Sequence, residues 1–127
     1  PVRLRTAIRR LAEAGIRVSL FIDPTAERVR QAVDLDVPAV EFHTGRYANA
    51  TKSKEADAEF EAITQAAKLA YKLGMGVNAG HGLNYRNVTR LIHIPEIVEY
   101  NIGHSIIARA VLVGLDQAVK EMKALLG

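Results

Sequence analysis

The sequence contains no cysteine, and this absence excludes disulfide bonds and thiolate metal sites. Proteins of reducing compartments commonly do without disulfides, so the cytoplasm is the simplest location to expect. The sequence also lacks any apolar run near the roughly 18 residues that a transmembrane helix needs. Its first residues show no charged-then-apolar leader of the kind that directs secretion. We therefore expect a cytoplasmic protein that does not enter a membrane.

Aromatic residues are scarce, with four tyrosines, three phenylalanines and no tryptophan among 127 residues. The net charge of +3 comes from 17 basic and 14 acidic residues. The basic residues gather early in the chain, at Arg3, Arg5, Arg9, Arg10 and Arg17. No aromatic residue interleaves with them, whereas a surface that binds single-stranded nucleic acid normally offers stacking rings. The composition favours a small anionic ligand over a nucleic acid.

Four apolar runs that end at turn residues predict strands, over residues 17–24, 38–45, 75–82 and 96–104. Apolar residues at helical spacing predict helices around these strands, over residues 1–15, 24–33, 53–74, 88–92, 105–114 and 115–127. Asp23 is the expected N-cap of the second helix and Asn84 that of the short fourth helix. The chain opens at Pro1, without methionine and directly on a helix, which favours a fragment of a longer protein.

Strands that alternate with helices predict an α/β fold with parallel strands joined by right-handed crossovers. No linker interrupts the pattern, so residues 1–127 are expected to form one unit of four βα repeats. A closed eight-stranded barrel typically needs about 250 residues. The chain is therefore expected to be either an open sheet or half of a barrel, with its strands in sequential order and its helices on the outer face. The inward residues Ser19, Phe21, Val77 and Ala79 are then expected to need partners.

Polar residues gather at the predicted carboxyl ends of the strands, where parallel α/β folds bind their ligands. These residues are Asp23, Glu41, His43, Thr44, Asn78, His81, Asn101 and His104. Alternation places Glu41 and His43 on one face of their strand. A carboxylate facing inward needs a partner or a function, so a structural hydrogen bond or salt bridge is the alternative interpretation of Glu41. His43 and Thr44 are interpreted as structural residues that orient the loop.

The phrase Asn-x-Gly-His occurs twice, at Asn78 to His81 and at Asn101 to His104. Gly82 and Gly103 allow backbone amides to approach a phosphate, and a helix that begins near His104 favours an anion at its N-terminus. His81 adds a titratable group at the same place. A tight turn at His81 and a simple helix cap at His104 are the alternatives. A zinc site of His43, His81 and His104 has no supporting spacing.

Three segments, VEFHTGRYANA, VNAGHGLNYRNV and EYNIGHSIIARAVLVGLDQAVKEMK, resemble the pyridoxine 5′-phosphate synthase family over essentially the whole chain. The resemblance is to the C-terminal half of that family, strands five to eight of a TIM-type (βα)8 barrel. It implies condensation of 3-amino-2-oxopropyl phosphate with 1-deoxy-D-xylulose 5-phosphate in vitamin B6 biosynthesis. It also implies a homo-octamer that needs no metal and no organic cofactor.

The same resemblance implies roles for single residues. His81 matches the proton-donating histidine, and Glu41 matches a glutamate that stabilises the transition state. Gly82, Gly103 and His104 match residues that hold the aminoketone phosphate.

The sequence departs from the family in two respects. The motifs of the first barrel half, including two catalytic bases and phosphate-binding arginines, are not in this sequence, and Ser105 replaces the alanine of the family's NIGHA motif. A non-catalytic, phosphate-binding half-barrel that associates with itself is therefore the alternative function. Another phosphosugar barrel, an isomerase or aldolase, is a third, although no lysine falls at a strand end to form a Schiff base.

Overall fold

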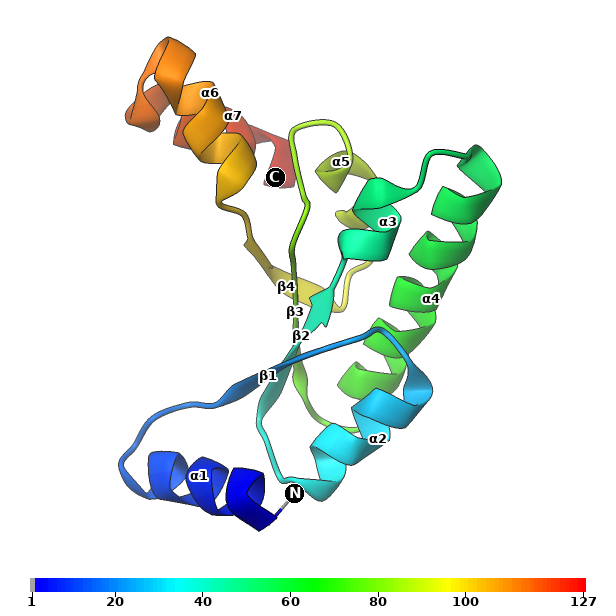
Figure 1. Cartoon of the computed structure of the whole chain (residues 1–127), viewed down its shortest axis with the longest axis vertical. Helices are drawn as coiled ribbons and strands as arrows, with labels where there is room; N and C mark the ends of the chain where they lie inside the picture. Colours follow the sequence, from blue (N-terminus) through cyan, green and yellow to red (C-terminus); the bar gives the residue numbers. More distant parts are fainter. Residues whose placement is uncertain (1) are drawn as a thin grey trace.

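A computed structural model describes residues 2–127, and its centre is a single four-stranded sheet (Figure 1). The strands are β1 (Ser19–Ile22), β2 (Ala39–His43), β3 (Gly76–Gly80) and β4 (Ile97–Asn101), and they lie in the order β1-β2-β3-β4. All three strand pairs are parallel. The predicted α/β class, the parallel pairing and the sequential strand order are therefore confirmed.

The helices are α1 (Val2–Glu13), α2 (Ala26–Asp34), α3 (Gly45–Asn49), α4 (Ser53–Lys72), α5 (Val88–Leu91), α6 (His104–Val113) and α7 (Leu115–Leu126). Helix α3 was not predicted, because five residues are too few to show a helical period.

Two predicted caps are wrong. Thr25, not Asp23, is the N-cap of α2, and its side chain accepts a hydrogen bond from the Arg28 amide (3.3 Å). Asn87 precedes α5, while the Asn84 side chain accepts from the Arg86 and Asn87 amides and so holds the turn before the helix.

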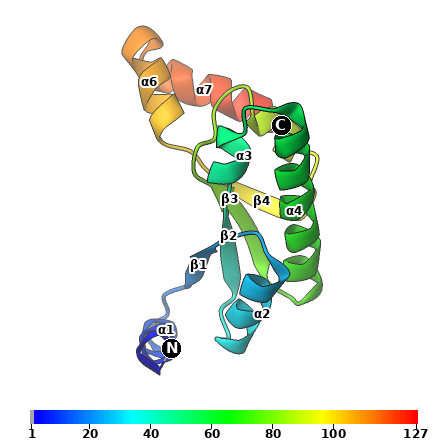
Figure 2. The same ribbon diagram turned by 45° about the vertical axis from the view of Figure 1, so that its right-hand side comes forward.

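One face of the sheet is covered by α2 and α4, which lie together on the same side of the strands (Figure 2). The strand residues that point to these helices include Val40, Phe42, Val77 and Ala79, all essentially inaccessible to solvent. Ile63 of α4 belongs to the same core. Val77 and Ala79 were expected on the inner face of the half-barrel, which is the face opposite these helices. That expectation was wrong, because the alternation of β3 turns Gly76, Asn78 and Gly80 to that face instead.

The opposite face of the sheet is open. Strand register aligns Phe21, Glu41, Asn78 and Glu99 in a single row across it. Phe21 is 54 % exposed there, as expected for a residue that lacks a partner. A shift of register between β3 and β4 occurs at Val77/Asn78, so that Ile97 pairs with Val77 whereas Glu99 pairs with Asn78. Because of this row, the open face presents polar side chains on β2, β3 and β4 and the apolar Phe21 on β1.

Helices α6 and α7 form a hairpin that extends away from β4 (Figure 1). Arg109 and Glu121 join the two helices through a two-point ion pair, with N–O distances of 2.8 and 3.1 Å. The side-chain hydrogen bond from Arg109, followed by that from Gln117, lowers the pKa of Glu121. The outer side of α6 is apolar but exposed, with Val111 82 % and Leu112 78 % accessible.

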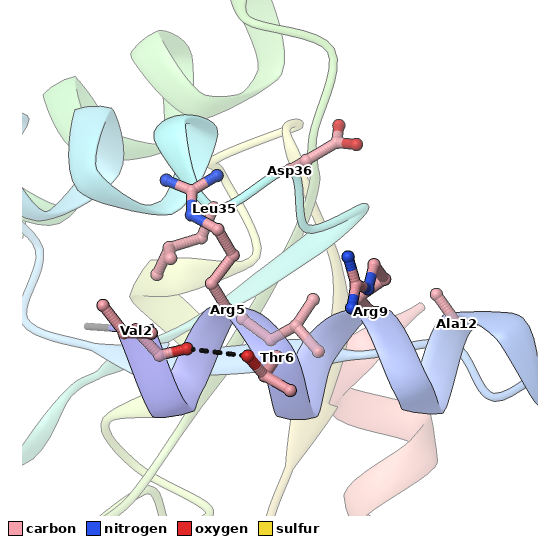
Figure 3. Close-up of a pocket in the computed structure, with 8 residues that line it drawn as sticks. Val2, Arg5, Thr6, Arg9, Ala12, Leu35 and Asp36 are labelled. Carbon is pink, nitrogen blue, oxygen red and sulfur yellow. Dashed lines mark hydrogen bonds between the residues drawn. The ribbon is translucent and has the colours of Figure 1, made fainter.

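A cavity of about 440 Å³ lies between α1 and the turn after α2 (Figure 3). Arg5, Thr6 and Arg9 line it from the helix, and Leu35 and Asp36 line it from the turn. The turn leads into the first residue of β2, so this cavity is at the amino end of the strands. Ligands of parallel sheets bind at the carboxyl ends, and the early cluster of arginines therefore lies away from the candidate site.

Tyr100 predicts a measurable loss of stability at high pH. Its side chain packs in the covered layer and donates a hydrogen bond to the Leu91 carbonyl (2.9 Å), and burial raises the pKa of Tyr100 from 10.0 to about 12. Because the folded state then holds the phenol proton more tightly, this contribution is complete below pH 10 and is lost as the pH rises towards 12.

We expect Tyr100→Phe to reduce the decline in unfolding free energy between pH 10 and 12, measured by urea denaturation at several pH values. Tyr71→Phe, which removes a phenol that is 67 % exposed, is the matched control. An identical decline in the Tyr100→Phe protein and the unaltered protein would contradict the assignment.

Candidate active site

Two loops at the carboxyl ends of β3 and β4 enclose a pocket of about 320 Å³. Residues 81–84 form one wall and residues 101–105 form the other. Four of the five predicted site residues line this pocket, namely His81, Gly82, Gly103 and His104. Glu41, the fifth, lies on the neighbouring open face and reaches the pocket through Asn101. The structure thus brings together residues that are more than twenty positions apart in the sequence.

The N-terminus of α6 opens into this pocket. Gly103 is the N-cap residue, His104 is the first residue of the helix, and no side chain within residues 2–127 caps the first turn. The Gly103 carbonyl already accepts from the Ile107 amide (3.0 Å), so the helix is regular from its start. The first-turn amides of a helix carry partial positive charge and favour an anion.

Gly103 has a negative φ of −116°, and an added Cβ at this position meets no atom within 4 Å. Within residues 2–127, neither backbone conformation nor packing requires glycine there. Glycine at such a position permits another group to approach the backbone closely.

Hydrogen bonds join the two walls of the pocket. The Ser105 hydroxyl of α6 donates to the Leu83 carbonyl of the opposite loop (2.9 Å). The Tyr85 hydroxyl donates to the Ala118 carbonyl of α7 (2.7 Å), which fastens the same loop to the hairpin. The distance between the loops is therefore fixed before a ligand binds. Sequence reasoning noted Ser105 only as a departure from the family motif.

His81 and Gly82 are consecutive residues in the left-handed region, with φ values of 81° and 75°. A Cβ at Gly82 would lie 2.7 Å from the Ala48 Cβ, so both the backbone and the packing require glycine there. His81 has a side chain in a conformation that costs most residues about 1–2 kcal/mol. Surrounding contacts hold it there, and the sequence carried no signal of this strain.

Thr44 and His43 supply those contacts. Thr44 is fully buried, and its hydroxyl oxygen lies 2.8 Å from the Gly80 carbonyl oxygen and 2.7 Å from that of His81. The imidazole of His43 stacks on that of His81 with ring centroids 4.4 Å apart and an interplanar angle of 23°. The loop that carries His81 is contacted by these two residues, which stand at the end of β2 and directly after it.

Glu41 takes part in a network of carboxylates and amides on the open face. The Asn101 side-chain amide donates to Glu41 (2.8 Å) and to Glu99 (3.2 Å), and the Asn78 amide also donates to Glu99 (3.2 Å). A Cβ on Gly80 would collide with the Glu41 carboxylate in its present position and lie 3.1 Å from the Asn101 carbonyl oxygen, so glycine leaves room for this arrangement. The partner that an inward carboxylate needs is therefore Asn101, and Glu99 is a second carboxylate that sequence reasoning missed.

The two Asn-x-Gly-His phrases are not structurally equivalent. Strand register pairs Asn78 with Glu99, and it pairs Gly80 with Asn101, so the second phrase lies two residues further along its strand. His81 is a strained loop residue, whereas His104 begins a helix. The two motifs form different walls of one pocket and are not two copies of one structural element.

Within residues 2–127, no three side chains of the metal-binding types come together in a way that would hold a metal ion. None of the helices described is long and apolar enough to cross a membrane.

Comparison with known proteins gives consistent matches along the chain. Residues 2–127 match the family described as pyridoxal phosphate biosynthesis protein PdxJ. Pyridoxine 5'-phosphate synthase of Magnetococcus marinus is 51% identical over 124 residues, which cover 98% of this chain and 51% of the relative. The enzyme of the same name from Trichlorobacter lovleyi is 53% identical over 116 residues, covering 91% of this chain and 48% of the relative.

The relative from Idiomarina loihiensis, also named pyridoxine 5'-phosphate synthase, is 50% identical over 120 residues and is covered over 50% of its length. The chain thus spans about half the length of the curated relatives that it matches. The family match extends over every residue that the structure describes. The chain therefore belongs to the pyridoxal phosphate biosynthesis protein PdxJ family.

Proposed function

We propose that this chain forms the C-terminal half of a pyridoxine 5′-phosphate synthase, a (βα)8 barrel whose strands five to eight are β1 to β4. The observation that carries the proposal is the convergence of His81 and the α6 N-terminus on one pocket, with Glu41 joined to it through Asn101. The reaction condenses 3-amino-2-oxopropyl phosphate with 1-deoxy-D-xylulose 5-phosphate. Two relatives that bear this enzyme's name support it, since they are 51% and 50% identical to this chain over 51% and 50% of their own length.

In this proposal the α6 N-terminus holds the phosphate of the aminoketone. Gly82 and Gly103 allow the phosphate to approach the backbone, and His104 contributes its amide in the first turn of the helix. The open space at Gly103 supports this role, because nothing else in the described chain accounts for the missing side chain.

His81 is the proton donor in this proposal, and Glu41 stabilises positive charge. Ring closure through imines, enolisation and loss of water requires a placed acid at each proton transfer. The hydroxyl that leaves as water takes a proton, and His81 borders the pocket where the substrate would lie. A fixed carboxylate such as Glu41, held by the Asn101 amide, stabilises a cationic iminium transition state.

The remaining half of the barrel is proposed to come from sequence that precedes these residues in the relatives. The open sheet face, with Phe21 exposed, and the exposed side of α6 support this view, because both are surfaces that a further layer would cover. In the proposal, residues 1–127 form one unit of that barrel, and the assembled protein is a cytoplasmic homo-oligomer, an octamer as the family resemblance implies. Its substrates are small phosphorylated molecules and it needs no cofactor.

The test of the proposed function is turnover by the full-length protein. Incubation with both substrates should give pyridoxine 5′-phosphate and one inorganic phosphate for each ring formed, measured by fluorescence and by phosphate release. The matched control omits either substrate. Absence of product from a folded, full-length protein with both substrates present would reject the assignment.

The Ser105 hydroxyl predicts different phosphate affinities for two substitutions at this position. Ser105→Ala should weaken binding of inorganic phosphate a few-fold, since a hydrogen bond contributes about 0.5–1.5 kcal/mol and this one fixes the distance between the loops. Ser105→Thr, which keeps the hydroxyl, should bind nearly as the unaltered protein does. Binding is measured by ³¹P line broadening or by calorimetry.

Gly103→Ala should weaken phosphate binding more strongly, because its methyl group would occupy the space that the ligand needs, while thermal stability stays unchanged. If phosphate binds equally well to Gly103→Ala and to the unaltered protein, the anion does not lie at the start of α6.

The second candidate function is a half-barrel that binds phosphate without catalysis and associates with itself. The exposed apolar residues Phe21, Val111 and Leu112 favour it, since paired copies would cover them. Phosphate binding together with absence of turnover in the full-length protein distinguishes this candidate.

A further inference from the structure

We propose that His43 is a positioning residue that sets the ring of His81 for proton transfer. The inference rests on the proposed function, because it assumes that His81 is the proton donor. It goes beyond that function by assigning a task to a residue that does not touch the substrate. Three features of the structure carry it: the stack of the two rings, the fixation of His43 itself, and the strained backbone of His81.

The rings form a continuous series from the open face to the pocket. Phe21 contacts His43 with centroids 5.1 Å apart and planes at 51°, and His43 contacts His81 at 4.4 Å and 23°. One face of the His81 ring is therefore covered by His43, and its rotation about χ1 and χ2 is restricted. A positioned donor needs such a restriction, because proton transfer depends on direction as well as distance.

His43 is held by its own neighbourhood. The Gly45 amide donates a hydrogen bond to Nδ1 of His43 (3.2 Å). Nδ1 is consequently an acceptor, and the ring proton of neutral His43 lies on Nε2. An added Cβ at Gly45 would collide with the His43 ring and lie 3.0 Å from Cδ2 of His81, so both rings pack against this glycine.

The backbone of His81 is held by Thr44, the residue between His43 and Gly45. The Thr44 hydroxyl lies against the carbonyl oxygens of Gly80 and His81, and the Thr44 amide donates to Gly80 (2.9 Å). His81 keeps a φ of 81° under these contacts. The segment His43-Thr44-Gly45 thus holds the backbone of His81 with its middle residue and the ring with its outer two.

A direct chemical role for His43 is the competing interpretation. The lining of the 320 Å³ pocket, as far as residues 2–127 form it, includes His81 but not His43. Nδ1 of His43 is engaged by Gly45, and the ring lies between Phe21 and His81. His43 is therefore placed to orient a donor rather than to exchange a proton with substrate.

Three substitutions at position 43, made in the full-length protein, separate these roles. His43→Phe keeps an aromatic ring for the stack and loses the acceptor for Gly45, whereas His43→Asn keeps an acceptor near Nδ1 and loses the ring. His43→Ala loses both. We expect kcat to fall by up to ~10²-fold for the Ala and Asn variants, the loss that a misplacement of about 1 Å produces, with KM little changed. His43→Phe should recover most of kcat.

Gly45→Ala is the fourth variant and leaves both histidines in place. Gly45 lies in a helix and outside the left-handed region, so alanine is compatible with its backbone, yet the added methyl group would push the two rings apart. We expect kcat, measured per folded protein, to fall further than any change in the midpoint of thermal unfolding accounts for. A control at Gly76, which lies outside the left-handed region at the amino end of β3 and where an added Cβ meets chiefly the flexible end of Arg17, reports the general effect of a Gly→Ala change.

A readout independent of activity is the ring-current shift of the His81 ring protons in NMR spectra. Stacking should be visible in the unaltered protein and in His43→Phe, and lost in His43→Ala and His43→Asn. Phosphate binding at α6 should stay unchanged in all of them, because no variant touches that helix.

The outcomes separate the inference from the function on which it rests. If His43→Phe is as inactive as His43→Ala although its stack persists, His43 handles protons itself and the inference is wrong. If all variants turn over normally, the stack is merely structural and the inference is also wrong. If the unaltered protein has no turnover, the proposed function fails, and the ring-current shifts still decide whether His43 holds the ring of His81.

Discussion

His81→Ala in the full-length protein is expected to lower kcat by about 10²–10⁴-fold, the contribution typical of a single placed acid or base. The expectation follows from the position of His81, which borders the pocket between β3 and β4 and has its ring fixed against His43. KM for the aminoketone phosphate should change less, since the α6 N-terminus, which we propose holds the phosphate, is untouched. Steady-state product formation with each substrate varied in turn measures both constants.

The control for this variant must separate chemistry from backbone strain. Alanine at position 81 has to keep the left-handed φ of 81°, which is unfavourable for it. His81→Asn is the matched variant, because asparagine adopts this conformation more readily and lacks the imidazole. Both variants should lose kcat equally, whereas Asn should retain more stability. Near-normal kcat in His81→Asn would restore the simpler interpretation of this segment as a tight turn.

The sequence predicted the sheet well because its strands carry strong local signals. The alternation in VEFHTG placed Val40 and Phe42 against the helices and Glu41 and His43 on the other face, as the structure has them. The same reasoning failed on β3, where Val77 and Ala79 were assigned to the open face. A strand of two glycines, an asparagine and two small apolar residues leaves its direction to the packing of α4, which no local pattern reports.

The candidate site was predicted in its members but not in its construction. Position after a strand was enough to select His81, Gly82, Gly103 and His104, which line one pocket. The contacts that hold them depend on geometry between distant segments. The Thr44 hydroxyl at the Gly80 and His81 carbonyls spans 36 and 37 positions, and no periodicity encodes such a bond.

The glycines of the site are explained by different features of the structure, whereas the sequence suggested close approach of a phosphate to the backbone. Gly82 is required by its φ of 75° and by Ala48, whereas Gly80 leaves room for the Glu41 carboxylate beside the Asn101 backbone. Gly103 is required by nothing in the described chain. The third case is the one on which our proposal of a phosphate at the start of α6 rests.

The residues 1–127 by themselves are expected to form no detectable pyridoxine 5′-phosphate. By the family resemblance, the two catalytic bases belong to the first half of the barrel, and the relatives that this chain matches are about twice its length. The loss of one placed base typically lowers a rate by about 10²–10⁴-fold, so the loss of two removes activity for practical purposes. His81 and Glu41 would still be present, but without the groups that remove protons from the substrates.

The isolated chain should also reveal its open surfaces by associating. Phe21 on the sheet face and Val111 and Leu112 on α6 are exposed, and the edges of β1 and β4 offer unpaired backbone groups. We expect dimers or larger species by light scattering rather than a stable monomer. Addition of the separately produced first half of a relative should reduce this association and restore turnover. The matched control is the same mixture with His81→Asn, which should restore the size but not the activity. Turnover by a monomer of 13.9 kDa would show that this half carries its own bases.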